Sequence, residues 1–336
     1  MAGSLPALFS RIFLIGYIIP AAAILLATCA VIDLHIGTTM FAAAKSAITS
    51  SPEKLLAIGI GIFAALAWVL AVLLMVSNLA LIQLLEGYGS LNPAQLLKWR
   101  TLRIFTKLSE ERDQMADKLR AGTLSQAQQD QYGDVLARLA DEFPEQKDLV
   151  LPTRFGNVVR AFERYPQVVY GIDAINAWAR LQAVIGEAYC LLLDEAKAQL
   201  DLLVNLWFGA LMICALHLSL LAWALIEGNG VPRHLGWGAW AIPIAALAAA
   251  LLAAKWAQSA AAQWGALVKG AFDLYRGELC RQMGLEMPRS IEHERAMWTT
   301  VAQTMLYRLP EYADGLTQYR PLNPLGQKDE KVPRAE

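Results

Sequence analysis

Four long runs of apolar residues constrain this chain more than any other feature of its sequence. The runs cover residues 12–32, 55–76, 202–226 and 236–254, and none contains Lys, Arg, Asp or Glu. A helix needs about 20 such residues to cross a bilayer, because lipid offers backbone N–H and C=O groups no hydrogen-bond partners. No segment shows the alternation of a strand. The sequence therefore predicts an all-α integral membrane protein with four transmembrane helices.

The composition agrees with this class. Of the 336 residues, 56% are hydrophobic and 18% are charged, whereas soluble domains carry about 25% charged residues. The first run has a second interpretation, since LLATC, which ends at Cys29, resembles a lipoprotein cleavage site. Thr28 stands where a smaller residue is expected, so we expect an uncleaved first span.

Lys and Arg near the ends of the runs predict the orientation, because cytoplasmic loops are enriched in these residues. One side holds Arg11, Lys98, Arg100, Arg103, Lys197, Lys255 and Lys269, and the other holds Lys45, Lys54 and Arg233. The first side is expected to be cytoplasmic, in a bacterial inner membrane, with both termini inside. Trp223, Trp237 and Trp240 flank the short outer loop between the third and fourth runs.

The runs divide the chain into five parts. Residues 1–91 are expected to form a transmembrane hairpin, 92–200 a cytoplasmic helical domain, 201–255 a second transmembrane hairpin, 256–314 cytoplasmic C-terminal helices, and 315–336 a disordered tail. Within the cytoplasmic domain, Asn92 and Pro93 are typical of a helix start, for a helix that ends near Arg120. A second helix is expected from Gln126 to Asp141.

Residues 154–165 form an amphipathic helix on a helical wheel, with Thr153 as its cap and Pro166 at its end. One face carries Phe155, Val158, Val159 and Phe162, and the other carries Arg154, Asn157, Arg160, Glu163 and Arg164. Three interpretations stay open. The apolar face packs on other cytoplasmic helices, or the helix lies on the inner leaflet, or Arg154, Arg160 and Arg164 bind a phosphate-bearing ligand.

The segment from Ala174 to Ile226 contains no proline, which predicts one helix of ~75 Å that begins at an Asp173 cap. Acidic residues recur along it with a seven-residue spacing that starts at Arg180. In a symmetric oligomer this face is expected to line a pore that passes cations. The pore-lining candidates are Glu187, Asp194, Asp201, Asn205, Phe208, Met212 and Ser219. Alternatively, the acids face water and Asn205 bonds to a neighbouring helix.

Signatures of catalysis and of cofactor or metal binding are missing from the sequence. It has no GxGxxG, P-loop, HExxH or GxSxG motif, and its four Cys and four His residues are scattered. We therefore predict no enzyme activity, no cofactor and no metal site, and a net charge of -1 gives no global signal for nucleic acid. A transporter ranks third, because the spans carry no buried acid or base pair for ion coupling.

The segment PTRFGNVVRAFERYP followed by YGID resembles a group of poorly characterised bacterial four-span membrane proteins, which implies the same topology. The overall plan is also similar to that of bacterial pore-forming effectors of anti-phage defence. The expected function is a gated homo-oligomeric pore, controlled by the cytoplasmic domain through a cytoplasmic ligand or protein partner. The alternative is a non-conducting membrane scaffold or signalling adaptor that recruits a cytoplasmic partner.

Overall fold

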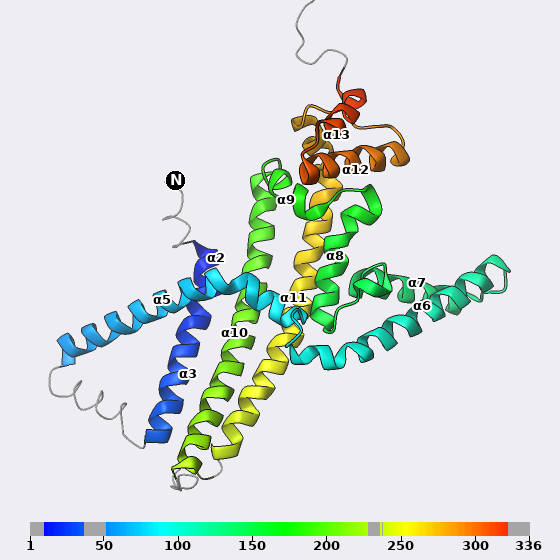
Figure 1. The fold of residues 1–336 in the computed structure, drawn as a ribbon. Helices are drawn as coiled ribbons and strands as arrows, with labels where there is room; N and C mark the ends of the chain where they lie inside the picture. The colour runs from blue at the N-terminus through cyan, green and yellow to red at the C-terminus, as the bar shows by residue number, and fades with distance from the viewer. Residues whose placement is uncertain (1–9, 37–51, 228–235, 237, 322–336) are drawn as a thin grey trace, which may run out of the picture. The chain divides into compact units, whose positions relative to one another are not determined.

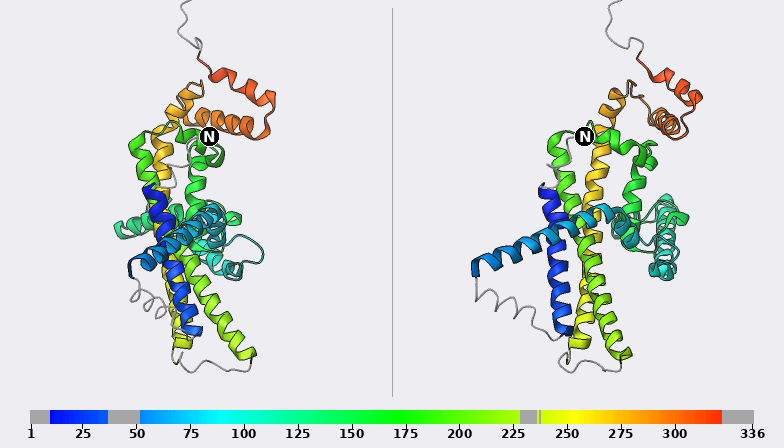
Figure 2. Two further views of the ribbon diagram at one scale, coloured as in Figure 1. Left: turned by 90° about the vertical axis from the view of Figure 1, so that its left-hand side faces the viewer. Right: turned by 60° about the vertical axis from the view of Figure 1, so that its left-hand side comes forward.

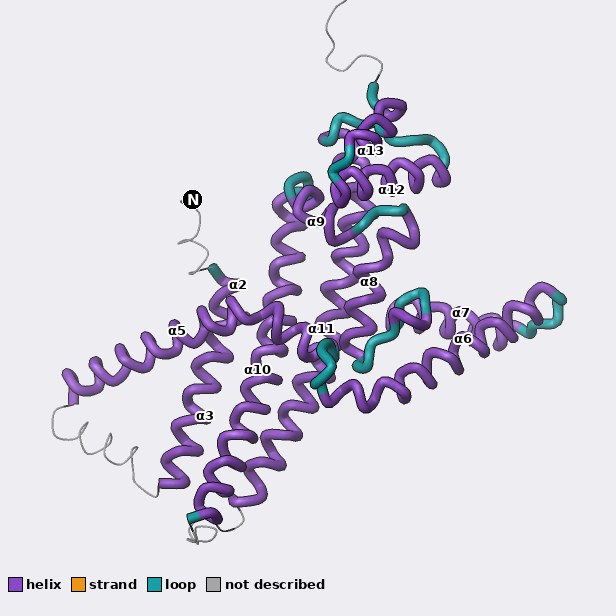
Figure 3. The backbone as a smooth tube through the Cα atoms, viewed as in Figure 1, coloured by secondary structure: helices purple, strands orange, loops and turns teal. Residues whose placement is uncertain are grey.

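The chain is helical throughout the part that the computed structural model describes, which is residues 10–36, 52–227, 236 and 238–321 (Figures 1 and 3). No strand occurs among these residues, so the all-α prediction is confirmed. Lys45, Arg233 and Trp237 lie outside the described residues, as does most of the predicted tail, from residue 322 onward.

The chain divides into two compact units. The apolar unit comprises Met1–Thr101, Leu151–Gly156 and Asp194–Trp264, and the hairpin unit comprises Leu102–Val150, Asn157–Leu193 and Gly265–Glu336. Four helices are long and apolar enough to cross a membrane, at the four predicted positions. Their ranges are Arg11–His35, Ala57–Glu86, Glu187–Ile226 and Ala239–Gln282.

These ranges correspond to a small set of elements. The first consists of α2 (Arg11–Phe13), the π-helical turn η1 (Leu14–Ile18) and α3 (Ile19–Ile36). The others are α5 (Pro52–Glu86), α10 (Glu187–Ile226) and α11 (Gly238–Gln282). Within the apolar unit, α3 lies beside α10 in Figure 1, and α5 crosses both at a large angle (Figures 1 and 2).

Close approach of α3 and α10 depends on a glycine. A Cβ at Gly209 would lie 2.4 Å from Ile24 Cγ1, so a larger residue at position 209 would require the Ile24 side chain or one of the helices to shift. The outward faces of the same unit are apolar, as shown by exposed side chains such as Ile60 at 60%, Leu79 at 68% and Leu251 at 66%. Such faces suit lipid or another apolar helix better than water.

The first residues of α8 (Arg154–Tyr170), the helix predicted at 154–165, belong to the apolar unit, and Thr153 just before it bonds to the end of α5. The Thr153 hydroxyl donates to the carbonyl of Glu86 at 2.9 Å and accepts from the N–H of Gly156 at 2.9 Å. A Cβ at Gly156 would lie 2.5 Å from the Glu86 oxygen. Thr153 thus caps α8 as predicted, and it also satisfies a carbonyl that α5 leaves open.

The hairpin unit is built around two antiparallel helices. After η2 (Pro93–Leu97) come α6 (Lys98–Arg120) and α7 (Gln126–Glu142). Phe105 and Leu108 of α6 form a core with Phe143 and Val150, which follow α7, and Leu139 of α7 packs against it. The short η3 (Lys147–Leu149) leads toward α8 (Arg154–Tyr170) and α9 (Ala174–Gln182). The C-terminal elements are α12 (Ile291–Tyr307), α13 (Pro310–Gly315) and η5 (Thr317–Tyr319).

The predicted single helix from Ala174 to Ile226 is wrong. The helix breaks after Gln182 and begins again at Glu187, where the N–H of Tyr189 bonds to the carbonyl of Gly186 at 2.9 Å. Val184, Ile185 and Gly186 are weak helix formers, and Ile185 is buried. Arg180 therefore does not belong to the same helix as Asp194 and Asp201.

Two predicted boundaries are also wrong. Pro166 lies inside α8, which continues to Tyr170 and ends at Gly171, where φ is +78°. A tail starting at Gly315 is contradicted by the described residues that follow, since the Tyr319 carbonyl accepts a hydrogen bond from the N–H of Glu286 at 2.7 Å. Proline costs a helix one hydrogen bond but does not always end it.

Candidate functional site

A buried carboxylate lies at the centre of the apolar unit. Asp201 on α10 is 2% exposed, and its Oδ2 accepts from the Tyr17 hydroxyl at 2.8 Å. Its Oδ1 accepts from Asn78 Nδ2 at 2.9 Å and from Lys197 Nζ. Elements far apart in sequence thus converge on one carboxylate. Ionisable groups among apolar helices are expensive, so such a cluster is a functional candidate.

One turn further along α10, Asn205 is fully buried and its Nδ2 donates to the carbonyl of Gly16 at 2.8 Å. Pro20, four residues after Gly16, has no N–H, so the usual α-helical donor to that carbonyl is missing. The π-helical turn η1 carries both Gly16 and Tyr17. The amide of Asn205 therefore supplies a donor that the proline removes.

Two oxygens of this cluster lack partners. Asn205 Oδ1 and Asn78 Oδ1 are both buried without a hydrogen bond. Lys197, in contrast, has two neighbours, since its ammonium also lies 5.7 Å from the centre of the Trp264 ring. Its side chain is 28% exposed, against 4% for Asp201, so the pair is open to water on the lysine side.

A pair of histidines lies near the other end of α10. His35 Nε2 and His217 Nδ1 are 3.1 Å apart, and His217 Nε2 lies 3.2 Å from the carbonyl of Ala239. His217 is fully buried. Among the described residues, no group of three or more His, Cys, Asp or Glu side chains is placed to hold a metal ion.

The predicted pore-lining residues fall into two groups in the structure, one buried inside the chain and one at least partly exposed. Asp201 and Asn205 do not belong on an outward face, because both are buried and bond to α5, to α10 or to η1. This is a correction of the prediction, and for Asn205 it matches the alternative interpretation. Glu187 and Asp194 are exposed, and so is Met212 at 45%. Phe208 is half-buried, and the exposed Ser219 donates to the Ala215 carbonyl at 2.7 Å.

The three candidate arginines have different surroundings. Arg154 is exposed in the apolar unit, whereas Arg160 and Arg164 are half-buried in the hairpin unit. Arg164 Nε donates to Glu145 Oε1 at 2.9 Å, which neutralises its charge. Burial raises the pKa of Glu163, and the nearby Arg160 opposes that rise. Anion binding by these arginines stays a prediction.

The apolar face of α8 is buried as predicted, but its polar face is not all exposed. Phe155, Val158, Val159 and Phe162 are at most 5% exposed, and Asn157, expected on the solvent side, is fully buried. A groove of ≈ 380 Å³ lies beside this helix in the hairpin unit. Its lining is mostly apolar: Phe105, Arg112, Leu136, Leu139, Ala140, Phe143, Pro144, Glu145, Ala161, Arg164, Tyr165, Val168 and Val169.

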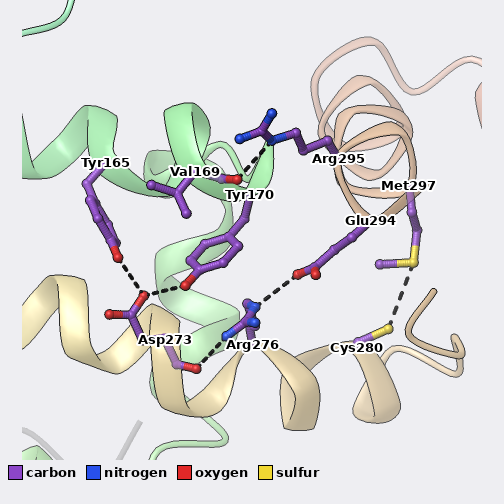
Figure 4. A network of polar contacts seen from close by, with 9 residues as sticks. All are labelled: Tyr165, Val169, Tyr170, Asp273, Arg276, Cys280, Glu294, Arg295 and Met297. Atoms are coloured by element: carbon purple, nitrogen blue, oxygen red, sulfur yellow. Dashed lines mark hydrogen bonds and ion pairs between the residues drawn. The ribbon is translucent and has the colours of Figure 1, made fainter. Parts of the chain in front are cut away.

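A polar network joins α8, α11 and α12 (Figure 4). The hydroxyls of Tyr165 and Tyr170 donate to Asp273 Oδ1 at 2.9 and 2.7 Å. Arg276 lies 4.1 Å from the centre of the Tyr170 ring and donates to Glu294 Oε1 at 2.9 Å. Burial, followed by the bond to Asp273, raises the pKa of both tyrosines.

Arg295 closes the same network at the end of α8. Its Nε donates to the Val169 carbonyl at 2.9 Å, and one terminal nitrogen donates to the Val168 carbonyl at 3.3 Å. These are among the carbonyls that a helix end leaves without partners. The network thus fixes α12 against α8 and α11, and we assign it a structural role.

Comparison with protein-family models, curated proteins and solved structures finds no match to this chain. The resemblance carried by the PTRFGN and YGID segments therefore stays a prediction, and function must be inferred from the geometry alone.

Proposed function

We propose that this chain is a non-conducting, multi-pass membrane protein whose hairpin unit binds a cytoplasmic partner, as a scaffold or signalling adaptor. One observation carries the proposal. The strongly polar side chains of α10 from residue 201 onward, Asp201, Asn205 and His217, are at most 2% exposed and bond within the chain. A water-filled lumen needs polar groups that remain available after the protomer has folded.

The hairpin unit supports the binding half of the proposal. Its groove has a volume within the range of about 300–1,000 Å³ that is typical of binding sites, and its lining is mainly aliphatic and aromatic. Leu136 and Val168 line it and remain 40% and 46% exposed. An apolar surface of this kind, bordered by charged residues such as Arg112 and Glu145, is typical of a protein-binding site.

Conduction tests the first half of the proposal. The purified full-length chain, reconstituted in planar bilayers, is expected to give no current above that of protein-free bilayers. Step-like currents that increase with protein concentration and change when Met212 is replaced by Trp would contradict the proposal. They would support the pore instead.

Site-specific photo-crosslinking in living cells tests the second half. A photoreactive residue at Leu136 is expected to give one protein adduct of defined mass, and a second substitution, Val168→Glu, is expected to abolish it. Leu119, which is 47% exposed on α6 and does not line the groove, is the control position. No adduct at Leu136, or an adduct that survives Val168→Glu, would refute a partner in the groove.

A gated, cation-passing pore is the second candidate. It is favoured by the exposure of Glu187, Asp194 and Met212 along one helix, since these side chains are available to another copy of the chain. In a homo-oligomer the two acids would form rings that concentrate cations. In that case Asp194→Asn would lower the preference for cations over anions. A role in anti-phage defence, suggested by the similar plan of pore-forming effectors, would then be testable by phage challenge.

For localisation we propose the bacterial inner membrane, with both termini and the hairpin unit in the cytoplasm. The basic residues near the ends of the apolar runs support this orientation.

A further inference from the structure

The cluster around Asp201 contains more oxygen atoms than its hydrogen bonds use. Asn205 Oδ1 and Asn78 Oδ1 are buried without partners. The Asn78 amide contacts the Asp201 carboxylate, which is 2% exposed, and Asn205 lies one helical turn after Asp201 on α10. We propose that these oxygens form a binding site for a monovalent alkali cation, with Na⁺ as the reference ligand. In the present structure the ammonium of Lys197 occupies the charged side of that site.

The two amides are fixed with their oxygens available. Asn78 Nδ2 donates to Asp201 and Asn205 Nδ2 donates to the carbonyl of Gly16. Rotating the Asn78 amide by half a turn would lose its bond and place Oδ1 against the Asp201 carboxylate. Rotating the Asn205 amide would lose its bond and place Oδ1 against the Gly16 carbonyl oxygen. Each Oδ1 therefore stays free for a cation, which is the type of partner that an unpaired buried oxygen accepts.

The three side chains gather around the π-helical turn. Asp201 and Asn205 are four residues apart on α10, so they share one face of that helix. They bond to consecutive residues of η1, Tyr17 and Gly16. The amide of Asn78 touches Asp201 directly, so its Oδ1, on the same carbon as Nδ2, lies beside the carboxylate. Irregular helix turns with spare oxygens are where membrane proteins hold Na⁺.

The charge of the site selects a monovalent cation. Asp201 is its single carboxylate, whereas Ca²⁺ sites combine several carboxylates among six to eight oxygen ligands. Lys197 neutralises Asp201 now, but its ammonium has alternatives. It lies 5.7 Å from the centre of the Trp264 ring, which attracts cations, and its side chain is 28% exposed. An entering cation can therefore displace the ammonium without leaving it buried and unpaired.

The experiment uses the purified full-length chain in detergent micelles. Thermal unfolding and tryptophan fluorescence are measured against NaCl, KCl and choline chloride at constant ionic strength, and binding of ²²Na⁺ is measured directly. We expect a saturable rise in unfolding temperature with the alkali salts that choline does not reproduce. Competition between cold NaCl and KCl for the ²²Na⁺ signal then gives the selectivity.

Variants separate a cation site from a structural ion pair. Lys197→Gln removes the competitor, so the half-saturating Na⁺ concentration is expected to fall by about tenfold or more, the effect of one adjacent like charge. Asn205→Leu is expected to abolish the response. Glu195→Gln, an exposed charge change on the same helix, is the matched control and leaves the response unchanged.

A purely structural role predicts something different. In that case Lys197→Gln lowers the unfolding temperature equally in all three salts, and neither it nor the wild type binds ²²Na⁺. That result overturns the proposal. The decisive variant, Lys197→Gln, retains the Asp201 carboxylate and therefore keeps the proposed site. The outcome is independent of whether the chain conducts ions or binds a partner.

Discussion

Two glycines of α11 make a matched test of how the hairpin unit is packed. Gly265 and Gly277 lie in the same helix and the same unit, and helical propensity alone predicts that alanine stabilises both. The gain for Gly→Ala in a helix interior is about 0.8–1.0 kcal/mol. At Gly277, which is exposed, a Cβ would meet nothing within 4 Å, so we expect the whole gain.

Gly265 is expected to give the opposite sign. A Cβ there would lie 2.3 Å from Phe162 Cδ1 and 2.7 Å from Cγ. Phe162 is 5% exposed, so its ring has little room to move. Overpacking of this kind costs about 1–3 kcal/mol, which exceeds the propensity gain over most of that range. We therefore expect Gly265→Ala to lower stability and to differ from Gly277→Ala by about 1–3 kcal/mol.

The assay is thermal unfolding of the full-length chain in one detergent, followed by the fluorescence of its tryptophans. Phe162→Leu provides a double-mutant cycle, because a smaller side chain should relieve the clash and reduce the penalty of Gly265→Ala. Equal stabilisation by the two alanines, or strict additivity with Phe162→Leu, would refute the contact between α8 and α11.

Three further predictions follow from the network and the topology. Glu294→Gln, which removes the charge that Arg276 meets at 2.9 Å, is expected to cost about 1.5–3 kcal/mol of stability, whereas Glu278→Gln at the exposed Arg281 pair should change little. Because the folded-state pKa of Tyr165 and Tyr170 is raised, their contribution is present below the unfolded pKa of about 10 and is lost as pH rises. Alkaline unfolding of the Tyr165→Phe, Tyr170→Phe double variant should therefore depend less steeply on pH than that of the wild type, and an unchanged slope would contradict the assignment. A reporter inserted at Gly122, in the turn between α6 and α7, or fused after Glu336 is expected to be cytoplasmic, and an external Gly122 would reverse the topology.

The helices that the sequence predicted correctly depend on local information. Apolar runs of bilayer length and capping residues such as Thr153 and Asp173 act within a few residues of where they stand. The helix break at Val184, Ile185 and Gly186 also has a local cause. The prediction of one continuous helix considered only proline as a helix breaker. Two β-branched residues followed by glycine weaken a helix without a proline.

The Asp201 cluster is different, because its partners are remote in the chain. Asp201 meets Tyr17 across 184 residues and Asn78 across 123 residues. A seven-residue spacing along one helix shows which side chains share a face, but not whether that face meets water or another helix. For this reason the prediction failed at Asp201. This residue was expected to line a pore as part of an acidic stripe, but it is buried inside the chain.

One part of that cluster could have been predicted by accounting for backbone hydrogen bonds. Pro20 removes the N–H that would serve the carbonyl of Gly16, and a carbonyl at membrane depth needs another donor. The donor must be a polar side chain within another apolar run, which restricts the search to a few residues. Asn205 is one of them, and the structure shows its Nδ2 on that carbonyl at 2.8 Å. A proline and an asparagine in different spans therefore predict a helix contact that hydropathy alone does not reveal.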